Sequence, residues 1–258
     1  MHQTTSFAQP PITPRNRILS ALPDEDYARL APRLEYVEMP LGEILYRPTE
    51  TIRHVYFPFT GTISLTSVMA DGAETEVGIV GREGALGLPL LLGDESVPLK
   101  AVVQVVGTGA RIRSEVFKEE INRCGHLQRL LLKYAQAFFV QTAQTAACNR
   151  LHTLDRRLAC WLLTARDRAQ TNALPLTHEF ISVMLGVRRA GVTEALGAFH
   201  RGGLIDRARG RVSIIDPAGL GAVSCECYAM VRDEYNRVLG GQARPTEPAP
   251  FQPASLGA

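Results

Sequence analysis

The sequence predicts an α+β protein with three parts in order: an N-terminal β-roll, a long helix, and a C-terminal helix-turn-helix with a β wing. Ten of the 22 glycines lie within residues 42–109, where they separate short alternating runs. Residues 126–174 contain neither glycine nor proline, which is typical of helix. Residues 176–205 then read as helix, glycine turn and helix. A chain of 258 residues is also long enough for about two domains.

The β-roll is assigned to residues 18–113. Short strands are expected at 55–57, 62–65 and 76–80, where β-branched and aromatic residues alternate with others. Glycines at the ends of such runs supply the turns of a compact all-β domain. Residues 1–17 are expected to form a flexible N-terminus.

The long helix is assigned to residues 114–150 and is expected to dimerise. Apolar residues spaced alternately by four and three form the seam of a paired helix. The seam residues are Leu127, Leu131, Tyr134 and Phe138. Leu130, Leu132 and Phe139 fall outside it and are expected to face the β-domain. The alternative is a single helix that lies on its own β-domain. A polar joint at 149–153 separates this helix from the next domain.

The segment 151–220 is predicted to bind the major groove of DNA. Thr177 can cap the first helix, Gly186 supplies the turn, and the second helix buries one apolar stripe. Its exposed side chains are Arg188, Arg189, Thr193, Glu194 and Arg201. Residues 204–215 read as a two-stranded wing that carries Arg207, Arg209 and Arg211. The alternative is an ordinary helical hairpin with solvated arginines.

The charge distribution supports the DNA-binding interpretation. Residues 151–216 hold ten Lys or Arg against six Asp or Glu, whereas residues 1–150 hold fifteen against sixteen. The positive charge therefore accompanies the helix-turn-helix, as phosphate contact requires.

Several other classes of protein are disfavoured. No apolar run approaches membrane-spanning length, and the N-terminal residues do not show a basic segment followed by an apolar core, so a cytoplasmic location and no membrane partner are expected. An enzyme on a β-barrel would need clustered histidines, but His54 is the only one in the β segment. No Ser/His/Asp or phosphate-loop constellation appears, so the protein is not expected to be an enzyme.

The cysteines and the C-terminal residues allow fewer conclusions. Five scattered cysteines do not suggest a disulfide framework. Cys225 and Cys227 fall in a helix expected within 221–240, and two thiols do not fill a tetrahedral site, so no metal site is expected. Residues 241–258, rich in Pro, Gly and Ala, are expected to be a disordered tail.

With these parts in order, residues 18–220 resemble the Crp/Fnr family of bacterial transcription regulators. The most specific match is the pattern of Gly186, Arg189 and Val192 followed by Leu204 and Ile205. The resemblance implies a cyclic-nucleotide-binding-like β-roll that senses a signal, a dimerisation helix, and a winged helix that binds a palindromic operator. The implied partners are double-stranded DNA, a second copy of the chain, RNA polymerase and an unidentified small-molecule effector. Arg189 lies where the family commonly places an arginine that reads guanine.

The sequence departs from the family in both functional regions. Ala190 and Glu194 replace a glutamate and a second arginine of the best-known members, so a different operator is expected. The family's phosphate-binding cassette uses an arginine-serine pair for the cyclic phosphate, but Ala85 follows Gly84 here and no arginine stands at the expected place. The candidate effector-pocket residues are Arg82, Gly84, Ala85, Leu86, Lys100 and Thr142.

Cyclic nucleotide binding is therefore not expected, and no cofactor is assigned. An iron-sulfur cluster would need N-terminal cysteines, and residues 1–123 contain none. A haem would need well-placed axial ligands, which His54 alone does not supply. A remaining alternative is a signal-binding module that acts through protein partners without specific DNA binding.

Overall fold

The computed structural model describes residues 16–240, and the predicted tail at 241–258 and residues 1–15 lie outside this range. The predicted flexible N-terminus, residues 1–17, wrongly includes Asn16 and Arg17, which are part of the folded structure. Asn16 is fully buried, and its side-chain oxygen accepts hydrogen bonds from the amides of Ile18 and Leu19 at 3.0 and 3.3 Å. It therefore caps helix α1 (Arg17–Ser20), which packs against the β-roll.

The β-roll consists of two antiparallel sheets, in the orders β1-β7-β3 and β2-β6-β4-β5. The predicted strands at 55–57, 62–65 and 76–80 correspond to β3, β4 and β5. Phe57, Ile63 and Ile112 belong to the core of the roll and are almost fully buried. The strands are β1 (Glu35–Met39), β2 (Ile44–Tyr46), β3 (His54–Pro58), β4 (Thr62–Val68), β5 (Glu74–Val80), β6 (Lys100–Val105) and β7 (Gly107–Arg113).

Short helices close the roll: α2 (Asp24–Leu30), a 3-10 turn (Ala31–Arg33) and α3 (Leu88–Leu91). The predicted continuous helix 114–150 is two helices, α4 (Ser114–Asn122) and α5 (His126–Leu151). The break falls at Cys124, whose φ of +54° leaves the helical region, and at Gly125. The following helix, α6 (Leu154–Ala169), begins directly after the predicted joint at 149–153.

The predicted seam of α5 faces the chain's own core, which corrects that assignment. Leu127, Leu131 and Tyr134 are 6%, 1% and 0% exposed and belong to the β-roll core, and Phe138 packs against it. Phe139 lies outside the seam and is 69% exposed, although it also borders a cavity between α5 and the β-roll. Leu132 is 48% exposed and does not pack on the β-domain as expected, whereas Leu130 does pack there.

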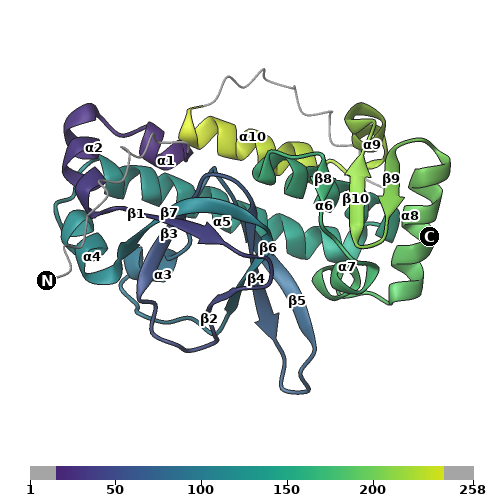
Figure 1. Cartoon of the computed structure of the whole chain (residues 1–258), viewed down its shortest axis with the longest axis horizontal. Coiled ribbons are helices and arrows are strands. Elements are labelled where there is room, and N and C mark those ends of the chain that lie inside the picture. The colour runs from purple at the N-terminus through teal and green to yellow at the C-terminus, as the bar shows by residue number, and fades with distance from the viewer. Residues whose placement is uncertain (1–15, 241–258) are drawn as a thin grey trace, which may run out of the picture.

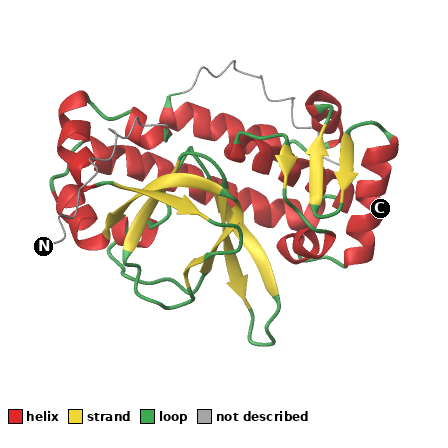
Figure 2. Cartoon of the chain, in the orientation of Figure 1, coloured by secondary structure: helices red, strands yellow, loops and turns green. Residues whose placement is uncertain are grey.

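The last helix explains this burial. Residues 221–240 were expected to form one helix but contribute to two, α9 (Pro217–Val223) and α10 (Cys227–Leu239), with a break at 224–226. Helix α10 runs back along α5, on the side away from the strands of the roll (Figure 2). Tyr235 and Leu239 of α10 enter the same core as Tyr134. Helix α5 therefore has the β-roll on one side and α10 on another.

The C-terminal domain surrounds a second core that contains Leu162, Leu196 and Val212. Its helices α7 and α8 and its small sheet lie at one end of α5 and α6 (Figure 1). The sheet has the order β8-β10-β9, so the predicted two-stranded wing gains a third short strand. The remaining elements are α7 (His178–Leu185), α8 (Arg189–Arg201), β8 (Ala173–Leu174), β9 (Ile205–Ala208) and β10 (Arg211–Ile214).

Within residues 16–240, no helix has both the length and the apolar character needed to cross a membrane.

Candidate functional site

The turn between α7 and α8 has the predicted geometry. The Thr177 hydroxyl accepts a hydrogen bond from the amide of Phe180 at 3.1 Å and so caps α7. Gly186 has a φ of +62°, a conformation in which a side chain would be strained. A Cβ at this glycine would also lie 3.2 Å from Oγ1 of Thr75 in the β-roll. The turn is therefore tight and rests on the β4–β5 hairpin.

Helix α8 presents the predicted polar surface. Val192, Leu196 and Phe199 are buried in the domain core, which fixes the rotation of the helix. The expected DNA-contacting side chains on α8 and its N-terminal flank are all exposed: Arg188, Arg189, Thr193, Glu194 and Arg201. This face of α8 is thus open to solvent.

Neighbouring acidic side chains pair only weakly with Arg189 on this face. Arg189 Nη1 lies 3.8 Å from Glu179 Oε2, and both side chains are more than two-thirds exposed, so the pair contributes little. The Thr193 hydroxyl donates to the Arg189 carbonyl at 3.1 Å and contacts His178 Nδ1 at 2.9 Å. These two contacts hold Thr193, in the middle of the exposed face of α8, in place.

The wing presents a second basic surface. Strands β9 and β10 pair in antiparallel register, and Gly210, with a φ of +72°, forms the turn. Arg207, Arg209 and Arg211 are all exposed on this hairpin, as expected. Sequence reasoning missed strand β8, whose two residues are too few to show a period.

The predicted effector residues separate into two groups. Ala85, Leu86 and Thr142 line a cavity of about 300 Å³ between the β-roll and α5. Gly84 lies behind it, where a Cβ would meet the Tyr134 ring at 2.2 Å. The other lining residues are also uncharged: Tyr46, Leu65, Val80, Gly87, Leu88, Pro89, Leu92, Val97, Leu99, Tyr134, Ala135, Phe138 and Phe139.

The two predicted cations do not reach this cavity. Lys100 Nζ pairs with Glu74 Oε2 at 2.6 Å, and Arg82 donates to Gln170 Oε1 at 2.7 Å. A bound phosphate needs a fixed cationic partner. The cavity is instead suited to an apolar ligand.

A buried ion pair that the sequence did not predict joins the two domains. Arg168 of α6 lies with its Nε 3.2 Å from Oε1 of Glu83, and both side chains are 7% exposed. The guanidinium also donates to the Ile79 carbonyl and to Gln141, and it stacks 5.0 Å over the Tyr235 ring. The sequence pattern could have indicated that this arginine is buried, since Arg168 continues the stripe of buried residues along α6.

A second buried carboxyl lies at the same interface. Trp161 of α6 donates its indole N–H to Oε1 of Glu76 at 2.8 Å, and the Ser64 hydroxyl donates to Oε2. Burial raises the pKa of Glu76 to about 7, despite these hydrogen bonds to the charged form. The contact therefore carries a group that titrates near neutral pH.

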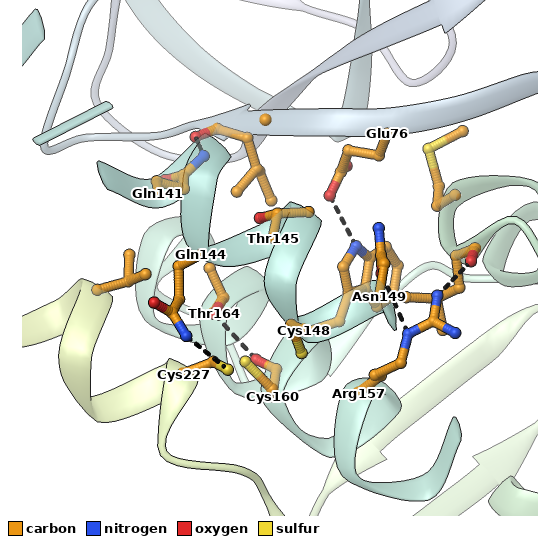
Figure 3. A pocket seen from close by; sticks show the side chains of 16 residues that line it. Glu76, Gln141, Gln144, Thr145, Cys148, Asn149, Arg157, Cys160, Thr164 and Cys227 are labelled. Carbon is orange, nitrogen blue, oxygen red and sulfur yellow. Dashed lines mark hydrogen bonds between the residues drawn. The ribbon is translucent and has the colours of Figure 1, made fainter. Parts of the chain in front are cut away.

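Four potential metal ligands meet where α5, α6 and α10 come together. The ligand atoms of Cys148, His152, Cys225 and Cys227 all lie within 4.8 Å of one another. Figure 3 shows Cys148 and Cys227 beside Cys160 in the small cavity that they line. From the sequence, only Cys225 and Cys227 were considered as metal ligands. Cys148 lies in the last turn of α5 and His152 directly follows that helix, so the two residues are four apart in sequence, and this spacing could have suggested them.

Two family models match the chain. One describes a cyclic nucleotide-binding domain and matches residues 36–124, and the other describes a Crp-like helix-turn-helix domain and matches residues 156–223. They correspond to the β-roll and to the domain that carries the exposed arginines of α8 and the wing. The chain is therefore a two-domain transcription regulator, and neither description is that of an enzyme.

Solved structures have the same architecture. A putative Crp/Fnr-family regulator from Eubacterium rectale is 18% identical, covers 81% of this chain and 98% of its own, and superposes with a TM-score of 0.63. FixK2 from Bradyrhizobium japonicum is 17% identical over 74% of this chain and 98% of its own, with a TM-score of 0.63. The c-di-GMP-responsive regulator CLP from Xanthomonas campestris is 13% identical over 74% and 99%, with a TM-score of 0.54. The chain belongs to the Crp/Fnr family. No curated protein matches its sequence.

Proposed function

We propose that the protein is a homodimeric regulator in the cytoplasm that binds a pseudo-palindromic operator and responds to a signal received by the β-roll. The observation that carries this proposal is the open face of α8, where Arg188 and Arg189 stand beside a wing with three further exposed arginines. A short helix with such a face fits the major groove, and the wing arginines fit phosphate. RNA polymerase is the expected partner of the bound dimer.

The exposed face of α5 is the proposed dimer interface in place of the corrected seam. Leu132, Phe139 and Ala146 are spaced seven residues apart, and Ala143 lies between the last two. All four are exposed. A heptad stripe of apolar residues on a 26-residue helix fits antiparallel or parallel pairing with a second copy. Phe139 also lines the apolar cavity, so the partner helix would cover the mouth of the sensor pocket.

The signal is proposed to be an apolar or weakly polar effector rather than a cyclic nucleotide. The segment that lines the cavity at Ala85 and Leu86 also holds Glu83, which pairs with Arg168 of the DNA-binding domain. A ligand that displaces this segment would therefore change the contact on which α6 rests. This route connects the pocket to the spacing of two recognition helices.

Arg189→Ala should weaken binding to the selected operator by about 1–3 kcal/mol and relax preference at one base pair in each half-site. The reason is that a guanidinium can donate two hydrogen bonds to guanine. Half-sites should lie about one helical turn, or roughly 34 Å, apart. Selection from random DNA, followed by titrations on selected and scrambled sites, measures both effects.

Arg209→Ala is the matched variant for phosphate contact. This substitution should weaken binding to all DNA sequences by the same factor, because a wing arginine at the turn contacts the phosphate backbone of DNA. It should also reduce the slope of log affinity against log salt concentration by about one. If Arg189→Ala lowers the affinity for selected and scrambled DNA equally, another residue of α8 must read the bases. If the unmodified protein binds no DNA in a salt-dependent manner, the module acts through protein partners instead.

Phe139→Glu should convert the dimer to a monomer and weaken operator binding, because it places a carboxylate in an apolar interface. Sedimentation velocity measures the change. Met230→Glu, which charges an equally helical and 51% exposed apolar position on α10, should leave the dimer intact. A dimeric Phe139→Glu protein would rule out the α5 stripe. Leu131→Glu would not test it, since that side chain is 1% exposed within the fold.

A further inference from the structure

The cluster of Cys148, His152, Cys225 and Cys227 assembles from three parts of the chain. Cys148 lies in the last turn of α5, and His152 follows in the joint to α6. Cys225 lies in the break between α9 and α10, and Cys227 is the first residue of α10. The three cysteines are each at most 7% exposed, and the His152 side chain is 14% exposed. A buried convergence of three thiols and an imidazole is the donor set of a tetrahedral zinc site.

The spacing between the donor atoms matches a single ion. Sγ of Cys148 lies 3.5 Å from Sγ of Cys225, and Sγ of Cys227 lies 3.5 Å from Nδ1 of His152. Zn–S bonds of about 2.3 Å and Zn–N bonds of about 2.0 Å give tetrahedral edges of roughly 3.5–3.8 Å. A multi-iron cluster needs more room than donor atoms within 4.8 Å of one another leave. The ligand set and its size therefore favour one tetrahedral ion.

The groups around the donors favour a bound ion as well. Nε2 of His152 lies 3.3 Å from Oε1 of Glu226, so an N–H at Nε2 can donate to this carboxylate while Nδ1 coordinates the ion. Nε2 of Gln144 donates to Sγ of Cys227 at 3.1 Å, as outer-shell groups do to metal-bound thiolates. Arg157 lines the same cavity as Cys148 and Cys227, so it can offset the net negative charge of three thiolates and one divalent ion.

We propose that these four residues bind one thiophilic divalent cation, with Zn²⁺ as the best match, and that the ion fixes the joint between α5 and α6. Binding releases the protons of the three thiols to solvent and forms three metal–sulfur bonds and one metal–nitrogen bond. The ion would tie the joint to α10, so its presence would set the orientation of the DNA-binding domain. This regulatory consequence rests on the proposed function, whereas metal binding does not.

The test titrates the full-length, reduced and metal-free protein with Co²⁺ under anaerobic conditions. We expect one Co²⁺ per chain, with the visible bands of a tetrahedral ion and thiolate-to-cobalt charge-transfer absorption, and displacement by Zn²⁺. Cys148→Ser and Cys227→Ser should each abolish the spectrum. Glu226→Gln should retain its shape but weaken Co²⁺ affinity about 10- to 100-fold, which identifies a positioning residue.

Two cysteines outside the set provide matched controls. Cys124→Ser, at an exposed position, and Cys160→Ser, beside the cluster, should both leave stoichiometry and spectrum unchanged. Loss of the bands in Cys160→Ser would overturn the ligand assignment. Absence of a tetrahedral spectrum in the parent protein, or mass spectrometry that finds a Cys148–Cys225 disulfide in place of bound metal, would overturn the site itself.

Operator titrations with and without Zn²⁺ examine the regulatory consequence. We expect operator affinity to differ about tenfold between the two conditions, and Cys148→Ser to remove this difference. An unchanged affinity with one ion bound would overturn the link to the joint. Failure to bind any operator, with the Co²⁺ spectrum intact, would instead overturn the proposed function and leave the metal site standing.

Discussion

Arg168→Ala is expected to lower the free energy of unfolding by about 3–5 kcal/mol, because it leaves the Glu83 carboxylate buried without its partner. Glu83 is 7% exposed in its side chain, and its Oε2 already lacks a hydrogen-bond partner among the described residues. The same substitution removes donors from the Ile79 carbonyl and from Gln141. Chemical denaturation followed by circular dichroism measures the loss.

Two further variants show whether the loss of stability comes from the unpaired carboxylate. Arg166→Ala, on the same helix, removes an arginine that is 30% exposed in its side chain and should cost less than about 1 kcal/mol. The double variant Arg168→Met with Glu83→Leu should recover most of the lost stability, because apolar pairs of similar volume replace buried ion pairs well. Should the double variant be as unstable as Arg168→Ala, the loss comes from packing rather than from the unpaired carboxylate.

Glu76→Gln is expected to stabilise the protein at pH 8 and to leave its stability nearly unchanged at pH 5. Burial raises the pKa of Glu76 from 4.5 to about 7, so the folded state holds a proton that the unfolded state has released between these values. Stability therefore falls as the pH rises from about 4.5 to 7, and the whole penalty, roughly 3 kcal/mol, is present above pH 7. Glutamine keeps an acceptor for Trp161 and removes the charge.

The single tryptophan makes this prediction simple to measure. Trp161 is the only tryptophan of the chain and donates directly to Glu76, so its fluorescence reports both unfolding and ionisation. A fluorescence titration of the native protein should show a midpoint near pH 7 that is absent in Glu76→Gln. Glu38→Gln, at an exposed position on β1, should shift neither curve. Equal stability of Glu76→Gln and the parent at pH 8 would contradict the raised pKa.

The sequence predicted the parts of the fold that local patterns specify. Alternation around glycines located β3, β4 and β5, and the cap at Thr177 with the turn at Gly186 located α7 and α8. These signals depend on neighbouring residues, and the exposed recognition arginines follow from the register of the buried stripe of α8. That much of the candidate site was accessible to sequence reasoning.

The errors concern what covers each surface. A four-three spacing on α5 specifies that Leu131 and Tyr134 are buried, but it does not distinguish a second chain from α10 and the β-roll. The pair of Glu83 and Arg168 and the contact of Cys148 with Cys225 join residues far apart in the chain. Charged and thiol side chains carry no period that reveals such partners, so only the folded arrangement could identify them.

The return of α10 along α5 has a consequence for how the protein forms during synthesis. Tyr235 and Leu239 complete the core of the β-roll, the Tyr235 hydroxyl donates to Gln141 at 3.0 Å, and Arg17 donates to Asn236 at 3.2 Å. The N-terminal domain therefore receives its last core residues only after the whole DNA-binding domain has left the ribosome. The two domains are successive in the sequence, but neither finishes folding before the other has been translated.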